Sequence, residues 1–153
     1  MIPDSIVHLL QTGVSVMVGT RDASLMPECT RAWGIHVGTD RGTVTVFLSE
    51  SIAGKTLDNL RENGMIAVTC TRPTDHITCQ LKGKVRSMKS VNSAQQKISR
   101  QWHHEFVAEL KAIGVPSALG EAWIVEPTVA VEMAVTDVFD QTPGPGAGKR
   151  IAR

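Results

Sequence analysis

Apolar residues alternate with small or polar residues in several short stretches of this chain, and a period of two predicts β-strands. These stretches are rich in β-branched residues and are separated by turn-like segments such as 21–24 and 72–75. The strands that we predict are 14–19, 29–37, 43–48, 65–71, 77–88, 122–125 and 128–139. Short turns or a short helix join most of the first five, so we expect neighbouring strands to pair antiparallel.

Three other segments carry apolar residues at the three- and four-residue spacing of a helix. A short helix is expected after Pro3, and a second helix is centred on Leu57 and Leu60 and ends at Asn63-Gly64. The longest helix covers about 90–113, where the recurring apolar residues are Val91, Ala94, Ile98, Trp102, Phe106, Leu110 and Ile113.

This mixture of elements predicts an α+β fold that is mainly β. About six antiparallel strands suit a small closed barrel with flanking helices, and a sandwich is the alternative. We expect residues 1–141 to form a single domain, because no repeat or second boundary is visible. Residues 142–153 are rich in Pro and Gly, and we expect a flexible tail there.

The charge balance of the chain excludes several classes of partner. Sixteen basic and fifteen acidic residues leave a net charge of +1, which argues against binding nucleic acid or a membrane through a basic field. No apolar run approaches the roughly 20 residues that span a bilayer. The segment Met1–Leu10 lacks the basic start of a signal peptide. We therefore expect a cytoplasmic protein with no nucleic-acid or membrane partner.

Cysteine and histidine positions do not indicate a metal site. Cys29, Cys70 and Cys79 lack the Cys-x-x-Cys spacing of zinc ligands. The turn between the fourth and fifth strands would place Cys70 opposite Cys79, as two small core residues in a reducing compartment. His103 and His104 point about 100° apart on a helix, so we interpret both as helix surface.

The segment from Leu48 to Thr56 carries the most chemical information, because it lies between a strong strand and a helix. The first amide groups of a helix lack internal partners and can bind an anion. Lys55 adds a positive charge, and Ser49 and Ser51 add hydroxyl groups. A phosphate group fits here on physical grounds, and a plain capped helix with a solvated lysine is the alternative.

This segment nearly matches the P-loop pattern Gly-x4-Gly-Lys-Thr, with Ser49 at the first glycine position. No parallel βαβ pattern surrounds it, and no acidic strand end for magnesium is evident. The sequence therefore does not favour a nucleotide hydrolase.

Three segments taken together resemble a known family. They are Arg31-Ala32-Trp33-Gly34-Ile35-His36 on the second strand, Leu48-Ser49 with Gly54-Lys55-Thr56 after the third, and Thr78-Cys79-Gln80-Leu81-Lys82-Gly83-Lys84 on the fifth. This order, with a helix before it and a longer helix after it, is similar to that of pyridoxamine 5′-phosphate oxidase-like proteins with an FMN-binding split barrel. The similarity covers roughly residues 5–140 and lies in the arrangement rather than in any single motif.

The resemblance implies an antiparallel six-stranded split β-barrel and a homodimer with two FMN sites at the subunit interface. Carried over by position, the cofactor residues are Arg31 and Lys55 at the phosphate, Leu48, Ser49 and Thr56 in the phosphate and ribityl segment, Ala32, Trp33 and Gly34 along the flavin ring, and Thr78 or Gln80 at the ring edge. Thr78 and Gln80 share one face of a strand, so they compete for that role. No catalytic residue is identified.

The sequence departs from the family pattern at two positions. The best-known members have an arginine where Gly54 stands and a lysine where His36 stands. A buried phosphate needs about two charge-assisted donors, and Arg31 with Lys55 could supply them. The specific oxidation of pyridoxamine phosphate is not expected, because that substrate carries its own phosphate and needs further basic residues.

Several of these residues also have a purely structural explanation. Arg31 could pair with Glu28 or Asp40, Trp33 could be a core or dimer-contact residue, and Gln80 could be a satisfied interior amide. The first functional hypothesis is an FMN-binding oxidoreductase acting on a small molecule. The alternative is a non-enzymatic binding or carrier module for a flavin, haem or other planar ligand.

Overall fold

The computed structural model of the protein describes residues 1–153 and is organised around one antiparallel sheet. The helices are α1 (Asp4–Leu10), α2 (Glu50–Asn63), α3 (Ser93–Ala112) and α4 (Ser117–Ala122). The strands are β1 (Ser15–Arg21), β2 (Pro27–Ala32), β3 (Ile35–Val37), β4 (Thr43–Leu48), β5 (Met65–Thr71), β6 (Thr78–Ser90), β7 (Val129–Asp140) and β8 (Arg150–Ala152). The fold is therefore α+β and mainly β, as predicted.

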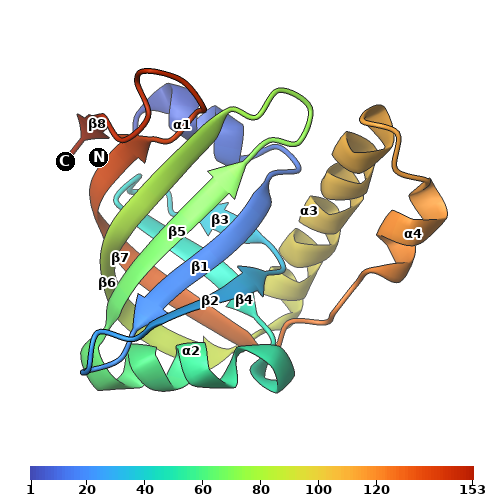
Figure 1. Cartoon of the computed structure of the whole chain (residues 1–153). Coiled ribbons are helices and arrows are strands. Elements are labelled where there is room, and N and C mark those ends of the chain that lie inside the picture. The colour runs from blue at the N-terminus through green and yellow to red at the C-terminus, as the bar shows by residue number, and fades with distance from the viewer.

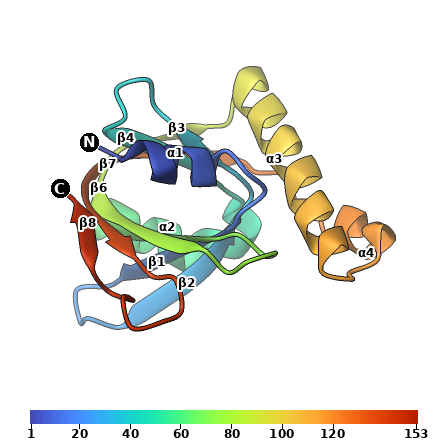
Figure 2. The same cartoon turned by 90° about the horizontal axis from the view of Figure 1, so that it is seen from above.

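The sheet closes on itself into a barrel (Figures 1 and 2). Its strand order is β2-β1-β5-β6-β7-β4-β3, and the two ends meet where the Trp33 amide donates to the Phe47 carbonyl at 2.7 Å and the Phe47 amide to the Gly34 carbonyl at 3.1 Å. The predicted strand 29–37 is thus one bent strand, broken at Gly34, whose φ of 136° favours glycine. Counted in this way, six strands form the wall, which confirms the barrel over the sandwich.

The core lies inside the barrel, because alternate residues of each strand face inward, and most of its side chains are aliphatic. On β1 the inward residues include Val16 and Val18, and both are fully buried. Cys70 of β5 pairs with Cys79 of β6 across the sheet, and both thiols are buried and free. This confirms the predicted placement of the two cysteines.

Helices α1, α2 and α3 pack on the barrel, and α4 joins α3 in an arm at its side. Helix α2 lies along one end of the barrel, where the Asn59 side chain donates to Thr20 at 3.1 Å (Figure 1). Helix α3 runs beside the β2–β3 bend and passes so close to Gly13 that a Cβ there would lie 2.2 Å from the backbone of Glu105. Helices α3 and α4 form an arm at the side, and no helix covers the outer face of β2, β1, β5 and β6 in Figure 1.

Two segments differ from the sequence prediction. Residues 122–125, predicted as a strand, end α4 and continue without regular structure, so that prediction is wrong. The Pro/Gly-rich segment 142–149 turns back to the sheet, and β8 pairs with the end of β7. None of the helices has the length and apolar character needed to cross a membrane.

Candidate functional site

A row of side chains crosses the uncovered outer face of the barrel. Arg31 on β2 pairs with Met17 on β1, Met17 with Thr69 on β5, and Thr69 with Gln80 on β6. Directly paired residues of neighbouring strands point to the same side of a sheet, so these four side chains lie in one line. Three strand spacings separate Arg31 from Gln80, or about 14 Å.

Arg31 is half-buried and has no carboxylate partner. Its Nη1 donates to Ser15 Oγ at 3.1 Å, and its guanidinium lies over the rings of Trp123 and Phe106, at 4.6 and 5.8 Å from their centroids. Burial lowers the pKa of this guanidinium. The predicted alternative of an ion pair with Glu28 is wrong, since no acidic side chain lies within 4.0 Å of Arg31.

Asp40, the second partner considered for Arg31, is bound elsewhere. Its carboxylate accepts hydrogen bonds from the amides of Gly42 and Thr43, both at 3.0 Å, and from the Thr43 hydroxyl at 2.8 Å. These hydrogen bonds lower the pKa of Asp40, with that from Gly42 contributing most. An arginine removed from water normally has an anionic partner. Neither Glu28 nor Asp40 supplies one to Arg31, so this position could accept an anion from a ligand.

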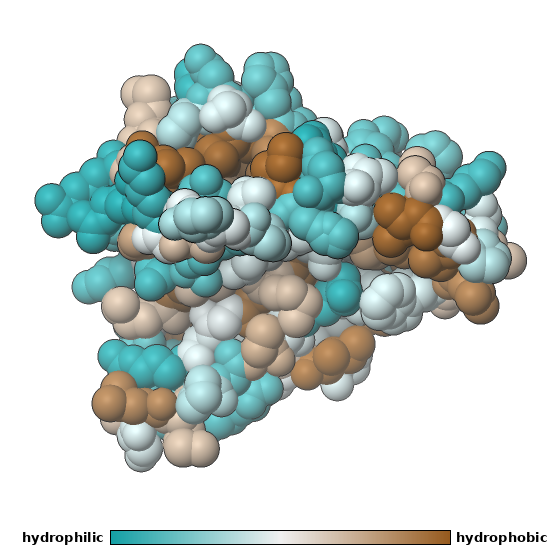
Figure 3. Space-filling view, turned by 45° about the horizontal axis from the view of Figure 1, so that its top comes forward, coloured by the Kyte–Doolittle hydropathy of each residue, from teal (hydrophilic) through white to brown (hydrophobic).

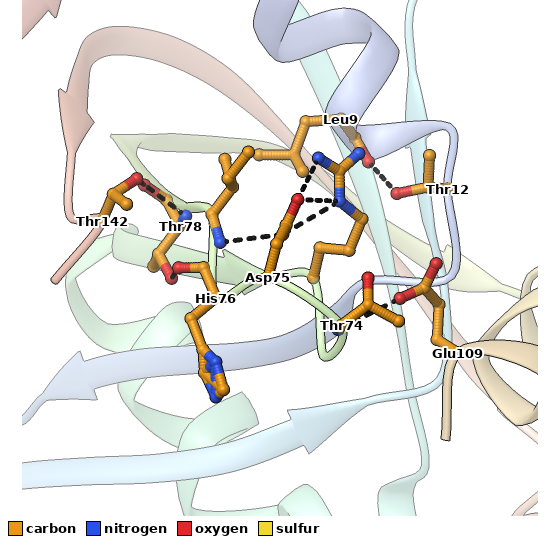
Figure 4. Close-up of polar contacts among 10 residues, drawn as sticks. Leu9, Thr12, Thr74, Asp75, His76, Thr78, Glu109 and Thr142 are labelled. Carbon is orange, nitrogen blue, oxygen red and sulfur yellow. Dashed lines mark hydrogen bonds and ion pairs between the residues drawn. The ribbon is translucent and has the colours of Figure 1, made fainter. Parts of the chain in front are cut away.

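The two candidates for the flavin edge lie at different positions on β6. Gln80 belongs to the Arg31 row, and its amide donates to Thr69 Oγ1 at 3.0 Å. Thr78 lies at the β5–β6 turn, where its hydroxyl contacts the His76 carbonyl at 2.9 Å and its amide donates to Thr142 at 3.1 Å (Figure 4). Both side chains lie on the outer face, but Gln80 alone belongs to the Arg31 row, whereas the hydroxyl of Thr78 is engaged within the turn.

The β2–β3 bend brings the first two motifs to one corner of the barrel. Trp33 bonds to Phe47, and Leu48 and Ser49 follow directly before α2. Ala32 and Leu48 face the core with no exposed surface, so only their backbone is available to a ligand. Trp33 is also a core residue, at 5% exposure, which agrees with its structural explanation.

Two buried polar atoms near this corner have no hydrogen-bond partner. They are Nε1 of Trp33 and Oγ1 of Thr56. Helix α2 is kinked at Ala53, so the helix proper restarts there and Thr56 lies in its first turn. Ser49 Oγ lies 2.9 Å from Ser51 Oγ at the beginning of the segment. Buried polar groups are rarely left unpaired in proteins, so these two atoms are compatible with a bound polar ligand.

Lys55 points away from Arg31. Its Nζ lies 3.7 Å from Asp22 beyond the end of β1, and the hollow beside it is also lined by Asp58 and Glu62. Met17, the partner of Arg31, lies five residues before Asp22, or about 16 Å along an extended strand. The structure therefore does not bring the two predicted phosphate ligands together within one chain.

Basic residues that the sequence analysis did not single out flank the Arg31 row. A hollow of about 420 Å³ lies beside it, with Gly19 and Ala67 in its lining and Arg21, Lys82 and Lys84 around them. Gln80, Lys82 and Lys84 alternate along β6, so the period of two could have placed them on one face. The outer face thus carries an excess of positive charge around its smallest side chains.

Another cavity, lined by both polar and apolar side chains, lies between α3 and α4, with a volume of about 460 Å³. Both ring nitrogens of His103 are buried there without a partner, which corrects the prediction that His103 is a surface residue. Burial lowers the pKa of His103, and nearby Glu121 acts in the opposite direction. No group of three or more His, Cys, Asp or Glu residues is arranged to hold a metal ion.

These residues fit the phosphate-bearing FMN in part. Arg31 offers the four N–H groups that Ser15 does not use, and Trp33 and Thr56 offer unpaired polar atoms. Lys55 joins such a site only by leaving Asp22, which an exposed ion pair permits at little cost. Arg31 is therefore the candidate with the most unused hydrogen-bond donors.

The fold is that of the pyridoxamine 5′-phosphate oxidase-like split barrels. No protein-family model matches the chain, and no curated protein matches it in sequence. HupZ of Group A Streptococcus superposes with a TM-score of 0.62 at 17% identity, over 97% of this chain and 100% of HupZ.

Two further structures with this fold are described as binding or storing different cofactors. A pyridoxamine 5′-phosphate oxidase-related, FMN binding protein of Nostoc punctiforme has a TM-score of 0.52 at 12% identity, over 97% of this chain and 95% of its own. HutZ, the haem storage protein of Vibrio cholerae, has a TM-score of 0.51 at 11% identity, over 92% and 95%. At these identities the similarity establishes the fold, which agrees with the resemblance seen in the sequence.

Proposed function

We propose that the chain is an FMN-binding, oxidoreductase-like protein that works as a cytoplasmic homodimer. The observation that supports this most is Arg31, a half-buried arginine without an acidic partner on the uncovered face of a split barrel. Its in-plane N–H groups suit a phosphate, because guanidinium and phosphate form bidentate, charge-assisted pairs. The unpaired polar atoms of Trp33 and Thr56 are further candidate contacts for a polar ligand.

FMN, when bound, supplies the redox chemistry, and the protein holds and orients it. Arg31 anchors the phosphate, and Gln80, about 14 Å away in the same row, directs its amide toward the far end of a ligand lying across the face. The amide is free to rotate from Thr69 toward a ring edge, since that hydrogen bond joins two partly exposed side chains. A partner subunit would cover the other side of the ligand and exclude water.

FMN titration followed by fluorescence quenching tests this proposal. Arg31→Ala should weaken FMN binding by about 1.5–3 kcal/mol, the range for hydrogen bonds to a charged group, or roughly 10- to 150-fold. Riboflavin, which lacks the phosphate, should bind both proteins equally. Lys55→Ala measures whether that lysine leaves Asp22 to join the phosphate. Equal FMN affinity of the wild type and Arg31→Ala would refute the site.

Haem is a second candidate ligand, which the α3–α4 cavity specifically favours. His103 offers an imidazole lone pair that no protein group uses. Val107 and Ile124 line the cavity with apolar surface, while Arg100 and Lys111 supply positive charge that suits carboxylates. A neutral imidazole is the commonest protein ligand for metals of this kind.

Haem titration distinguishes the two candidates. Wild-type protein should shift the Soret band of added haemin, His103→Ala should abolish the shift, and the adjacent exposed His104→Ala should retain it. If His103→Ala and His104→Ala behave like the wild type, the cavity does not ligate haem. Arg31→Ala should not alter haem binding, so the proposed FMN site and the proposed haem site can be tested independently.

A further inference from the structure

The Arg31 guanidinium contacts two aromatic rings, one of which belongs to a stacked pair on α3. Trp102 and Phe106 of α3 pack face to face, with centroids 5.3 Å apart and planes inclined by 7°. The Arg31 guanidinium lies at 5.8 Å from Phe106 and 4.6 Å from Trp123. The Trp102 indole donates to the Val14 carbonyl at 2.9 Å, so the stacked pair is fixed to the barrel.

The second ring, that of Trp123, is held by the α3–α4 arm. Gly120 of α4 packs so closely on α3 that a Cβ there would lie 3.2 Å from the side chain of Val107. The Trp123 amide bonds to the Gly120 carbonyl at 3.3 Å, which ends the helix. Trp123 is 50% exposed, whereas Trp102 and Phe106 are buried. The arm thus delivers one exposed indole to the Arg31 side chain (Figure 3 shows the arm at the right, with apolar side chains on its surface).

The two rings determine how a ligand can approach Arg31. The two rings contact the guanidinium carbon, and four of the five N–H groups remain free of Ser15. A fixed guanidinium edge presents parallel donors at the spacing of two oxygens of one oxyanion. A desolvated cation–aromatic contact of this kind stabilises the charged group by enough to hold its orientation.

We infer that Trp123 is a positioning residue that fixes the Arg31 guanidinium for an oxyanion arriving in its plane, a terminal phosphate or a carboxylate. This inference rests on the Arg31 site of the proposed function, but it needs no flavin. It also assigns the arm a role that barrel closure does not require, because Trp123 touches Arg31 and lies outside the core.

Inorganic phosphate and acetate are the probes that test this inference, with FMN and riboflavin as larger ligands. Their binding is followed by the Arg31 Nε–H signal in ¹H–¹⁵N spectra and by the emission of Trp123, the one tryptophan that is not buried. Trp123→Ala should weaken phosphate and FMN binding about tenfold, the scale of a desolvated cation–π contact. Trp123→Phe should recover most of the affinity, since it restores a ring over the guanidinium.

Leu119→Ala is the matched control, because Leu119 is an exposed apolar residue of the same arm. It should bind phosphate like the wild type. Unchanged affinity of Trp123→Ala, equal losses in Leu119→Ala, or no recovery in Trp123→Phe would each overturn the inference. If Trp123→Ala weakens phosphate binding while FMN does not bind the wild type, the inference stands and the proposed FMN function fails. A response to phosphate but not to acetate assigns the site to phosphate esters.

Discussion

A cation that is removed from water needs another group to stabilise its charge, whereas an exposed cation does not. Arg31 is an example of the first case and Lys55 of the second. Arg31 is half-buried, in contact with two rings and without an acid, so it retains an unused capacity for an anion. Lys55 has a side chain 57% exposed beside Asp22, and water satisfies most of its needs. An anionic ligand should therefore gain more binding energy from Arg31 than from Lys55.

The three thiols should differ in reactivity, because they differ in burial. Cys29 is exposed on β2, whereas Cys70 and Cys79 face each other in the core. The contact with Cys79 and burial together raise the pKa of Cys70, which disfavours the reactive thiolate. A thiol reagent should therefore titrate one group rapidly in native protein and three in denaturant. Fewer than three in denaturant would reveal a disulfide.

Thr56→Val should separate the stability role of the Thr56 hydroxyl from its binding role. The hydroxyl is buried without a partner, so replacing it by a methyl group should raise the free energy of unfolding by about 1 kcal/mol. FMN affinity should fall if the hydroxyl serves the phosphate. Urea unfolding measures the first effect, with Thr56→Ser as a control that keeps the hydroxyl and loses a buried methyl. A Thr56→Val protein less stable than Thr56→Ser would show that the hydroxyl is already satisfied.

At the scale of elements, sequence patterns correctly predicted helices that pack through one apolar stripe and strands in which apolar and polar residues alternate regularly. The apolar stripe from Trp102 to Phe106 marks α3, and strands β4 and β5 have the predicted bounds. The prediction of a strand at 122–125 was wrong because the apolar run in this segment resembles that of a buried strand. In the fold, β7 already pairs with β4, β6 and β8, so no edge remains for it beside β7.

The contact between α3 and α4 should weaken in acid, because His103 lies within it. Burial lowers the pKa of His103 below its ordinary value of 6.5, while Glu121 opposes and His104 reinforces that shift. Between the folded and unfolded pKa values the unfolded chain binds more protons, so stability is full above about 6.5 and is lost as the pH falls through the folded value.

Urea unfolding at about pH 7.5 and about pH 5.5 checks this dependence. Wild-type protein should lose more stability on acidification than His103→Gln, which cannot be protonated in this range. Arg100 and Lys111 also line the cavity and disfavour a further positive charge. The emission of Trp123 should change over the same interval if the arm loosens. Identical pH profiles for the two proteins would show that the pKa of His103 is the same in the folded and unfolded chain.

At the scale of the molecule, local sequence patterns predicted neither where the barrel closes nor which outer face is left uncovered by helices. The bend at Gly34 joins β2 to one neighbour and β3 to another, and only the three-dimensional path shows that the two ends of the sheet meet. The same path separates Lys55 from Arg31 and aligns Arg31 with Gln80. Motifs predicted which residues matter, while topology decided which of them share a surface.

The outer face of β2, β1, β5 and β6 should be the surface through which two copies pair. No helix covers it in Figure 1, and its centre is built of Gly19 and Ala67, with Met17 and Met65 beside them. Small and flexible side chains on a sheet allow a second sheet to approach closely, and a stable pair needs about 800 Å² from each partner. Trp33, considered above as a core or dimer-contact residue, is already buried within the chain, whereas Trp123 is 50% exposed and is the candidate interface tryptophan.

Ala67→Arg tests this pairing at the centre of the face. In a two-fold dimer the substitution places two like charges near the same axis, in a hollow where Arg21, Lys82 and Lys84 already outnumber the single acidic residue Asp137. Light scattering at micromolar concentration should give twice 16.5 kDa for the wild type and 16.5 kDa for Ala67→Arg. Ala112→Arg, at an exposed position near the end of α3, is the matched control and should remain dimeric. Circular dichroism should show all three proteins folded, and FMN binding should fall only in the monomeric variant. A wild-type mass of 16.5 kDa would refute the dimer and leave Arg31 to bind its ligand from one protomer alone.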